Sequence, residues 1–179
     1  MINIFEQALG KVVKALEEEG INYMVVGGFA TSYHNRARTT NDIDIVLQIY
    51  PKHIKSILKH FPDWKGFEQS FMESVKLGML FNITDLETGM RYDFITYKDS
   101  DYNWTAFNRR KKVTFFNKEF YMCTIEDLII SKLSWYNITP SEKQLEDIKF
   151  LLLNKDLNMN YIKSWIRRLN LKNYGRLLE

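Results

Sequence analysis

Two aspartates, Asp42 and Asp44, are the residues whose type and spacing most clearly indicate chemistry in this 179-residue chain. They begin the alternating segment 42–48, D-I-D-I-V-L-Q, which predicts a β-strand. Because successive side chains of a strand point to opposite faces, we expect both carboxylates on one face and Ile43 and Ile45 on the other. Two carboxylates this close repel each other, and a hard cation such as Mg²⁺ relieves the repulsion because it prefers oxygen ligands.

Residues that suit phosphate stand on the N-terminal side of these aspartates. Gly27 and Gly28 end an apolar stretch, and glycine lets the backbone approach a ligand closely. A short helix expected after them would add N–H groups that favour phosphate. Arg36 and Arg38 follow, and a guanidinium group can neutralise phosphate oxygens. Each feature alone is common, but together they indicate a site for a phosphorylated ligand beside a metal.

A third acidic residue, Asp93, stands among aromatic and apolar neighbours in a second predicted strand, 90–96. An acid in such surroundings is costly unless a partner matches it. Two interpretations stay open: Asp93 joins the metal site, or it is an edge-strand acid paired with Arg91 or Arg110. Two nearby acids in an expected polar loop rank lower, namely Asp99 and Asp101.

Strands are expected mainly in the first two-thirds of the chain and helices in the last third. Apolar residues at helical spacing predict a first helix over 2–16, stopped by Gly20. Alternation and turn residues predict strands at 23–26, 42–48, 79–84, 90–96, 113–116 and 120–123, and short helices at 29–34 and after Pro51. Helical patterns cover 125–136, 141–153 and 161–169, with Thr124 as an N-cap. We therefore expect an α/β or α+β core over 1–123 and a helical C-terminal portion over 124–179 packed on it.

The composition bounds the class of protein. Hydrophobic residues make up 45% and charged residues 26%, as in ordinary globular proteins. A single cysteine, Cys123, excludes an internal disulfide and a Cys-rich zinc site. We expect a cytoplasmic protein without a membrane partner, because neither a signal-peptide pattern nor an apolar run of ~18 residues is present. The net charge is +3, and basic clusters at 109–112 and 163–176 are either solvated surfaces or a surface for a phosphate-rich acceptor such as RNA.

The joint pattern resembles the nucleotidyltransferase fold of the polymerase-beta superfamily, in which a Gly-Gly or Gly-Ser precedes an acid-apolar-acid strand at a similar interval. The run 36–45, R-A-R-T-T-N-D-I-D-I, is similar to bacterial members related to abortive-infection toxins (AbiEii-like) and to minimal nucleotidyltransferases. The resemblance implies a mixed β-sheet flanked by helices. It also implies transfer of a nucleoside monophosphate from an NTP to an acceptor, with pyrophosphate released.

Roles for individual residues follow from the same resemblance. Catalytic and metal-binding roles fall on Asp42, Asp44 and Asp93, with two Mg²⁺ ions expected and Mn²⁺ as an alternative. Nucleotide-binding roles fall on Gly27, Gly28, Arg38, Thr40 and Lys132.

Two of the helical residues have alternative interpretations. For Lys132, in T-I-E-D-L-I-I-S-K-L, a nucleotide-binding role and a surface lysine paired with an acid one turn away are equally good interpretations. The segment S-E-K-Q-L-E-D-I lacks the arginine that is usual in the family. Two interpretations of its Asp147 therefore stay open, a structural role and a catalytic role.

Three functions stay open at this point. The favoured one is an enzyme that modifies tRNA, another RNA or a protein in a toxin–antitoxin or phage-defence setting, with a cognate antitoxin as a further expected partner. The second is nucleotide transfer to a small molecule such as an aminoglycoside, which would require an acidic cleft. The third is a nucleotide-binding regulator or antitoxin without catalysis.

Overall fold

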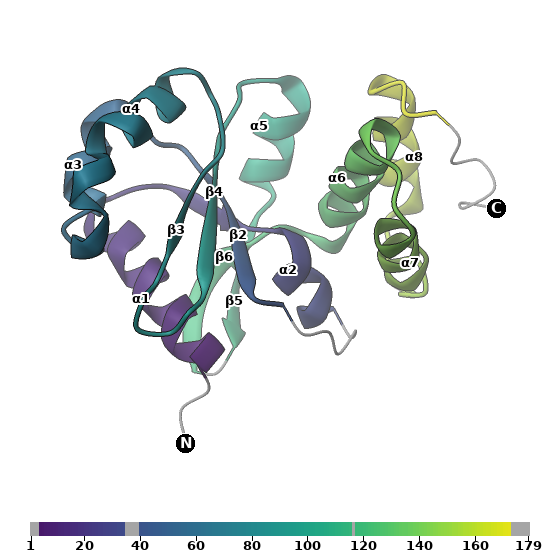
Figure 1. Ribbon diagram of the computed structural model, residues 1–179. Helices are drawn as coiled ribbons and strands as arrows, with labels where there is room; N and C mark the ends of the chain where they lie inside the picture. The colour runs from purple at the N-terminus through teal and green to yellow at the C-terminus, as the bar shows by residue number, and fades with distance from the viewer. Residues whose placement is uncertain (1–3, 35–39, 116, 173–179) are drawn as a thin grey trace.

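A mixed β-sheet forms the centre of the molecule in the computed structural model, which describes residues 4–34, 40–115 and 117–172 (Figure 1). Its six strands follow the order β3-β4-β2-β1-β6-β5. The pairs β2·β4 and β1·β6 are parallel, and the other pairs are antiparallel. The strands are β1 (Tyr23–Val25), β2 (Asp42–Leu47), β3 (Phe81–Thr84), β4 (Arg91–Thr96), β5 (Lys111–Phe115) and β6 (Lys118–Met122). The prediction of a mixed sheet with flanking helices is confirmed.

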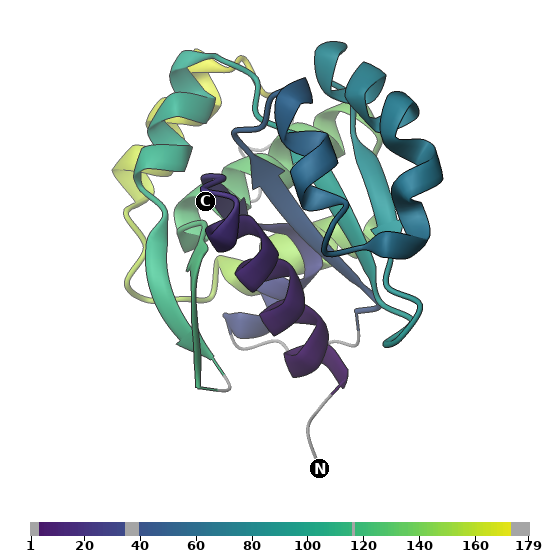
Figure 2. The same cartoon turned by 90° about the vertical axis from the view of Figure 1, so that its left-hand side faces the viewer.

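Helices cover both faces of this sheet. One face carries α1 (Ile4–Glu18), α3 (Ile54–Ile57) and α4 (Glu68–Lys76), which lie in front of the strands in Figure 2. Two 3-10 helices, η1 (Pro51–His53) and η2 (Pro62–Phe67), lead into α3 and α4. The opposite side carries α2 (Gly27–Tyr33), α5 (Asp101–Asn108), α6 (Ile125–Ile138), α7 (Glu142–Leu151) and α8 (Met159–Arg168) (Figure 1). In the part of the chain described here, no helix combines the length and the apolar character needed to cross a membrane.

The alternation in β2 sorts its side chains between these two layers. Ile43, Ile45 and Leu47 are almost fully buried in the hydrophobic core, as the sequence predicts. Asp42 and Asp44 are half-buried on the other side of the strand, where α2 begins. One strand therefore anchors the core with one face and presents two carboxylates with the other.

The three C-terminal helices share the core of the sheet. Thr124 caps α6, as predicted, because its hydroxyl oxygen accepts a hydrogen bond from the Asp127 N–H. A single cluster of buried apolar residues includes both sheet residues and side chains of α6, α7 and α8, such as Leu133, Ile148 and Ile162. The division of the chain into a core, 1–123, and a helical portion, 124–179, stays a proposal, because both segments contribute side chains to this one cluster.

One expected loop is a helix. Asp101, predicted to lie in a polar loop with Asp99, is instead the first residue of α5. The Ser100 side chain accepts a hydrogen bond from the Asn103 N–H and so caps the helix, while Ala106 and Phe107 bury its inner face. The loop interpretation of Asp101 was wrong because this N-cap and the short apolar pattern outweigh the polar composition.

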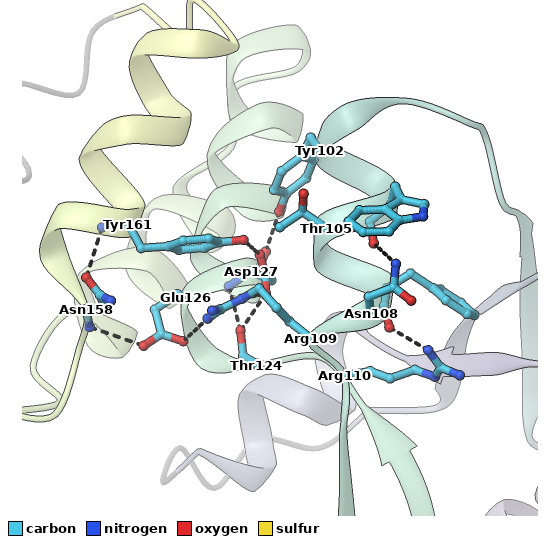
Figure 3. A network of polar contacts seen from close by, with 12 residues as sticks. Tyr102, Thr105, Asn108, Arg109, Arg110, Thr124, Glu126, Asp127, Asn158 and Tyr161 are labelled. Carbon is cyan, nitrogen blue, oxygen red and sulfur yellow. Dashed lines mark hydrogen bonds and ion pairs between the residues drawn. The ribbon is translucent and has the colours of Figure 1, made fainter.

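A buried carboxylate ties α5 and α8 to α6 (Figure 3). Asp127 accepts hydrogen bonds from Arg109 Nε at 3.1 Å, from the Tyr161 hydroxyl at 2.6 Å and from the Thr124 hydroxyl at 2.7 Å. The Tyr102 hydroxyl donates to the Asp127 backbone carbonyl, which adds a direct link from α5. This network, centred on Asp127, fixes the relative positions of three helices.

The basic cluster 109–112 is therefore largely committed to contacts within the fold. Arg109 joins the Asp127 network, and the Arg110 guanidinium lies 4.2 Å from the centre of the Phe107 ring. Lys112 pairs with Glu119 on the neighbouring strand. This cluster is thus not a row of unpaired cations.

The Asp127 network predicts unequal roles for two arginines that are otherwise well matched. The guanidinium carbons of Arg109 and Arg168 each lie 4.0 Å from the centre of an aromatic ring, and each arginine pairs with acid. Arg109→Met leaves the buried Asp127 carboxylate without its cationic partner, so we expect a loss of about 2 kcal/mol in the free energy of unfolding. Arg168→Met loses a similar ring contact, but the ion pair that it breaks, with Asp101, is exposed, so it should cost about 1 kcal/mol or less. Urea unfolding of both variants measures the difference, and equal losses would contradict the role assigned to Asp127.

Candidate active site

Three carboxylates share one face of the sheet where β2 and β4 run in parallel. The register places Asp44 directly opposite Asp93 and Asp42 directly opposite Arg91. Neighbouring strands lie about 4.8 Å apart, and residues two apart on a strand face the same way. The family resemblance implies that Asp42, Asp44 and Asp93 act at one site, and the strand register places them on one face of the sheet.

Arg91 lies between two of these acids. Its Nη2 atom is 3.2 Å from Asp42 Oδ2 and 2.8 Å from Asp93 Oδ2. The pairing of Asp93 with Arg91, left open by the sequence, is therefore present, whereas Arg110 stacks on aromatic rings elsewhere. The second oxygen of Asp93, Oδ1, is buried and has no hydrogen-bond partner among the described residues.

The glycine pair determines the surroundings of Asp44. Helix α2 starts on Gly27, two residues earlier than the sequence predicts, and Gly27 has a φ of +65°. A Cβ atom on Gly27 would lie 1.9 Å from Asp44 Oδ2, so only glycine fits this close approach. The Gly28 N–H donates a hydrogen bond to the same oxygen at 3.2 Å.

Burial gives Asp44 an unusual electrostatic state. Desolvation raises the pKa of Asp44 above its ordinary value, and the negative charges of Asp42 and Asp93 act in the same direction. The Gly28 N–H opposes this shift without cancelling it. A nearby positive charge would therefore stabilise the ionised form of Asp44.

The remaining predicted residues before β2 divide into two groups. The Thr40 hydroxyl donates to Asp42 Oδ1 at 2.5 Å, so in this structure it orients a carboxylate. Arg36 and Arg38, the arginines expected to meet phosphate, lie outside the described residues.

Lys132 reaches the same region from α6. Its ammonium group lies 2.9 Å from Asp147 Oδ2 on α7, and both side chains are largely buried. The alternative of a surface lysine paired one turn away is wrong, because the partner comes from the next helix. Asp147 thus has at least a structural role, since it matches the charge of a buried lysine.

A pocket of about 540 Å³ joins Asp44, the glycine pair and Lys132. Its size falls in the range of sites for small organic ligands. Strands β1, β2 and β4 form its floor, and α2, α5, α6 and α7 supply its walls. Residues of the wall that sequence reasoning missed include Tyr97, Asn103, Phe107, Trp135 and Gln144. The N-cap at Ser100 was the available indication for the α5 part of this wall.

The three aspartates suit a hard divalent cation by donor type. Within the described ranges, however, no three acidic, histidine or cysteine side chains are grouped closely enough to hold a metal ion as they stand. The guanidinium of Arg91 fills the place between Asp42 and Asp93, and the unpartnered Asp93 Oδ1 is an acceptor that a cation could satisfy. The donor types therefore suit a hard cation, while in this structure the Arg91 guanidinium pairs with two of the three carboxylates.

The family model and the fold identify the chain as a nucleotidyltransferase. The chain belongs to the family described as nucleotidyltransferase of unknown function (DUF6036), whose model matches residues 2–174. No curated protein matches the sequence.

Solved structures share the fold at low sequence identity. The antibiotic-resistance factor ANT(2'')-Ia in solution matches with a TM-score of 0.55 and 11% identity, covering 92% of this chain and 91% of that chain. The same factor in complex with adenylyl-2''-tobramycin gives 0.56 and 12%, covering 92% and 97%. An antigenic nucleotidyltransferase-like protein from Paracoccidioides brasiliensis gives 0.54 and 14%, covering 96% and 90%. At these identities the likeness shows the fold alone.

The close approach of Gly27 to Asp44 predicts a large effect of a single methyl group. Gly20 has nearly the same φ, +63°, but open space around it, so Gly20→Ala isolates the backbone cost of about 1 kcal/mol. Gly27→Ala adds the clash with Asp44, and we expect a loss of about 3 kcal/mol or more. Thermal or urea unfolding of both variants measures the difference. A loss for Gly27→Ala no greater than that for Gly20→Ala would show that Asp44 does not occupy this position.

Proposed function

We propose that this protein transfers a nucleoside monophosphate from an NTP to an acceptor hydroxyl at the face that carries Asp42, Asp44 and Asp93. Family membership gives the class of reaction. The observation that supports these residues is the register that sets Asp44 opposite Asp93 on parallel strands, with Asp42 on the same face. The glycine pair and Lys132 line the adjoining pocket.

Metal ligation is assigned to the three carboxylates. Asp42 and Asp44 would hold one Mg²⁺ and share a second with Asp93, with Mn²⁺ as an alternative ion. Such ions neutralise triphosphate oxygens and lower the pKa of an attacking hydroxyl. Thr40 supports this role, since its hydroxyl keeps Asp42 in place.

Side chains and backbone groups of the protein carry out proton transfer and bind the triphosphate. Asp93 accepts the proton of the acceptor hydroxyl, whose oxygen forms a bond to the α-phosphorus of the NTP. The bond between that phosphorus and the β-phosphate oxygen breaks, and pyrophosphate leaves. Gly27 and Gly28 allow the triphosphate to approach the backbone, and Lys132, oriented by Asp147, offers it a positive charge. Arg38 is retained as a further phosphate ligand.

The charges of the pocket favour an anionic acceptor over a cationic one. Two of its carboxylates are already neutralised inside the fold, Asp127 by Arg109 and Asp147 by Lys132. Two exposed lysines that also line the pocket, Lys98 and Lys143, form no ion pair with the described residues. This pattern supports RNA, such as tRNA, more than an aminoglycoside. A protein acceptor stays compatible with it, because a protein hydroxyl carries no charge.

The biological setting rests on sequence resemblance alone. Similarity of residues 36–45 to AbiEii-like proteins supports a toxin–antitoxin or phage-defence role in the cytoplasm, with a cognate antitoxin as partner. The competing functions are small-molecule nucleotide transfer, for which adenylyl-tobramycin in a structural neighbour is the precedent, and nucleotide binding without catalysis.

Transfer assays with labelled NTPs, Mg²⁺ and total RNA or cell extract test this proposal. Asp44→Asn keeps the shape of the side chain and can still accept the Gly28 N–H, but it removes the charge. We expect labelling to fall by about 100-fold or more, because electrostatic stabilisation dominates such reactions. Removal of divalent ions by EDTA should abolish labelling.

A matched control comes from Asp99→Asn, which removes an exposed acid in the loop after β4 and should keep full activity. Equal labelling by wild type and Asp44→Asn would contradict the assignment of Asp44. Tight NTP binding without transfer to any acceptor would favour the regulator, and labelling of an aminoglycoside but not of RNA would favour small-molecule transfer.

A further inference from the structure

We infer that Arg91 is a resident counter-ion that occupies the position of a divalent cation between Asp42 and Asp93, so that Arg91 and the metal compete for the same carboxylates. This inference rests on the proposed function, because it concerns the same three acids. It assigns to Arg91 control over when the site accepts a metal.

The strand register creates this arrangement. Arg91 is the direct neighbour of Asp42 across the parallel pair, and it precedes Asp93 by two residues on its own strand. Its side chain therefore points to the same face as both acids. A single nitrogen, Nη2, contacts both carboxylates at 3.2 and 2.8 Å, which is how one cation bridges two anionic ligands.

The acids need a positive charge when no metal is bound. Asp42, Asp44 and Asp93 share one sheet face, where like charges repel one another. Among the described residues, Arg91 is the only cation that forms an ion pair with Asp42 or Asp93. Lys132, which lines the adjoining pocket, already pairs with Asp147.

The Arg91 side chain can be displaced from Asp42 and Asp93 at low cost. Its side chain is 48% exposed, and exposed ion pairs contribute little because water and salt screen them. It also compensates the site incompletely, since Asp93 Oδ1 stays buried without a partner and Asp44 has no ion pair with it. A divalent ion carries twice the charge and can reach more carboxylate oxygens, so it can displace the guanidinium.

This competition makes metal binding depend on the nucleotide. Without nucleotide, part of the metal's binding free energy is spent on displacing Arg91, so the affinity for a free ion is lower than it would be without this arginine. An NTP adds phosphate oxygens as ligands and shifts the competition toward the metal. The protein therefore loads metal mainly together with its nucleotide.

Calorimetric titration with Mn²⁺ in the absence of nucleotide tests this inference without any measurement of activity. We expect Arg91→Met to bind Mn²⁺ about tenfold more tightly than wild type. The control is Lys112→Met, which removes an equal charge from β5, an edge strand separated from β4 by three other strands, and should leave the affinity unchanged. In EDTA, Arg91→Met should melt at a lower temperature than wild type, and Mn²⁺ should raise its Tm by more.

The outcomes separate this inference from the proposed function. If wild type binds Mn²⁺ and Arg91→Met binds no more tightly, Arg91 does not compete and the inference is overturned, while the metal site stands. If wild type binds no Mn²⁺ even with NTP present, the proposed metal site falls, and the inference with it. Arg91→Gln serves as the second variant, and it should show the same tighter binding if Arg91→Met does not fold.

Discussion

Repulsion among three carboxylates on one sheet face is the constraint on which the rest of this site depends. Asp44 and Asp93 are neighbours across parallel strands, and Asp42 follows the same face. Such a cluster is stable only with positive charge nearby. In this structure the Arg91 guanidinium meets this need for Asp42 and Asp93, and we propose that divalent ions meet it during catalysis. The glycine pair, the pocket and the buried lysine are arranged around that charge.

The two faces of the sheet have different roles: one packs the hydrophobic core, and the other carries the candidate site. The face toward α1, α3 and α4 is apolar, and it gives β2 the buried contacts that keep its register fixed. A slip of one residue would turn Asp42 and Asp44 into the core, so the hydrophobic residues Ile43 and Ile45 also protect the site. On the other face, the Asp127 network holds α5 and α8 against α6 and so maintains the walls of the pocket.

Sequence reasoning succeeds where the information is local. The alternation in 42–48 predicts which face carries Asp42 and Asp44, and the mixed sheet with flanking helices is confirmed. The pairing of Asp44 with Asp93 could not be derived, because a register between distant strands depends on the whole core. Arg91 was foreseen as a partner of Asp93 but not as a bridge to Asp42, for the same reason. Helix α5 was missed because its polar composition hid the Ser100 cap.

The central claim is that Asp42, Asp44 and Asp93 form one metal site that operates together with a nucleotide. A crystal structure with Mn²⁺ and a non-hydrolysable NTP analogue, recorded with anomalous scattering, tests it most directly. We expect an anomalous peak within coordination distance of oxygens of Asp42 and Asp44, with the Arg91 guanidinium moved away from Asp42. An analogue bound in the pocket with Mn²⁺ remote from these carboxylates, and Arg91 still bridging Asp42 and Asp93, would contradict it.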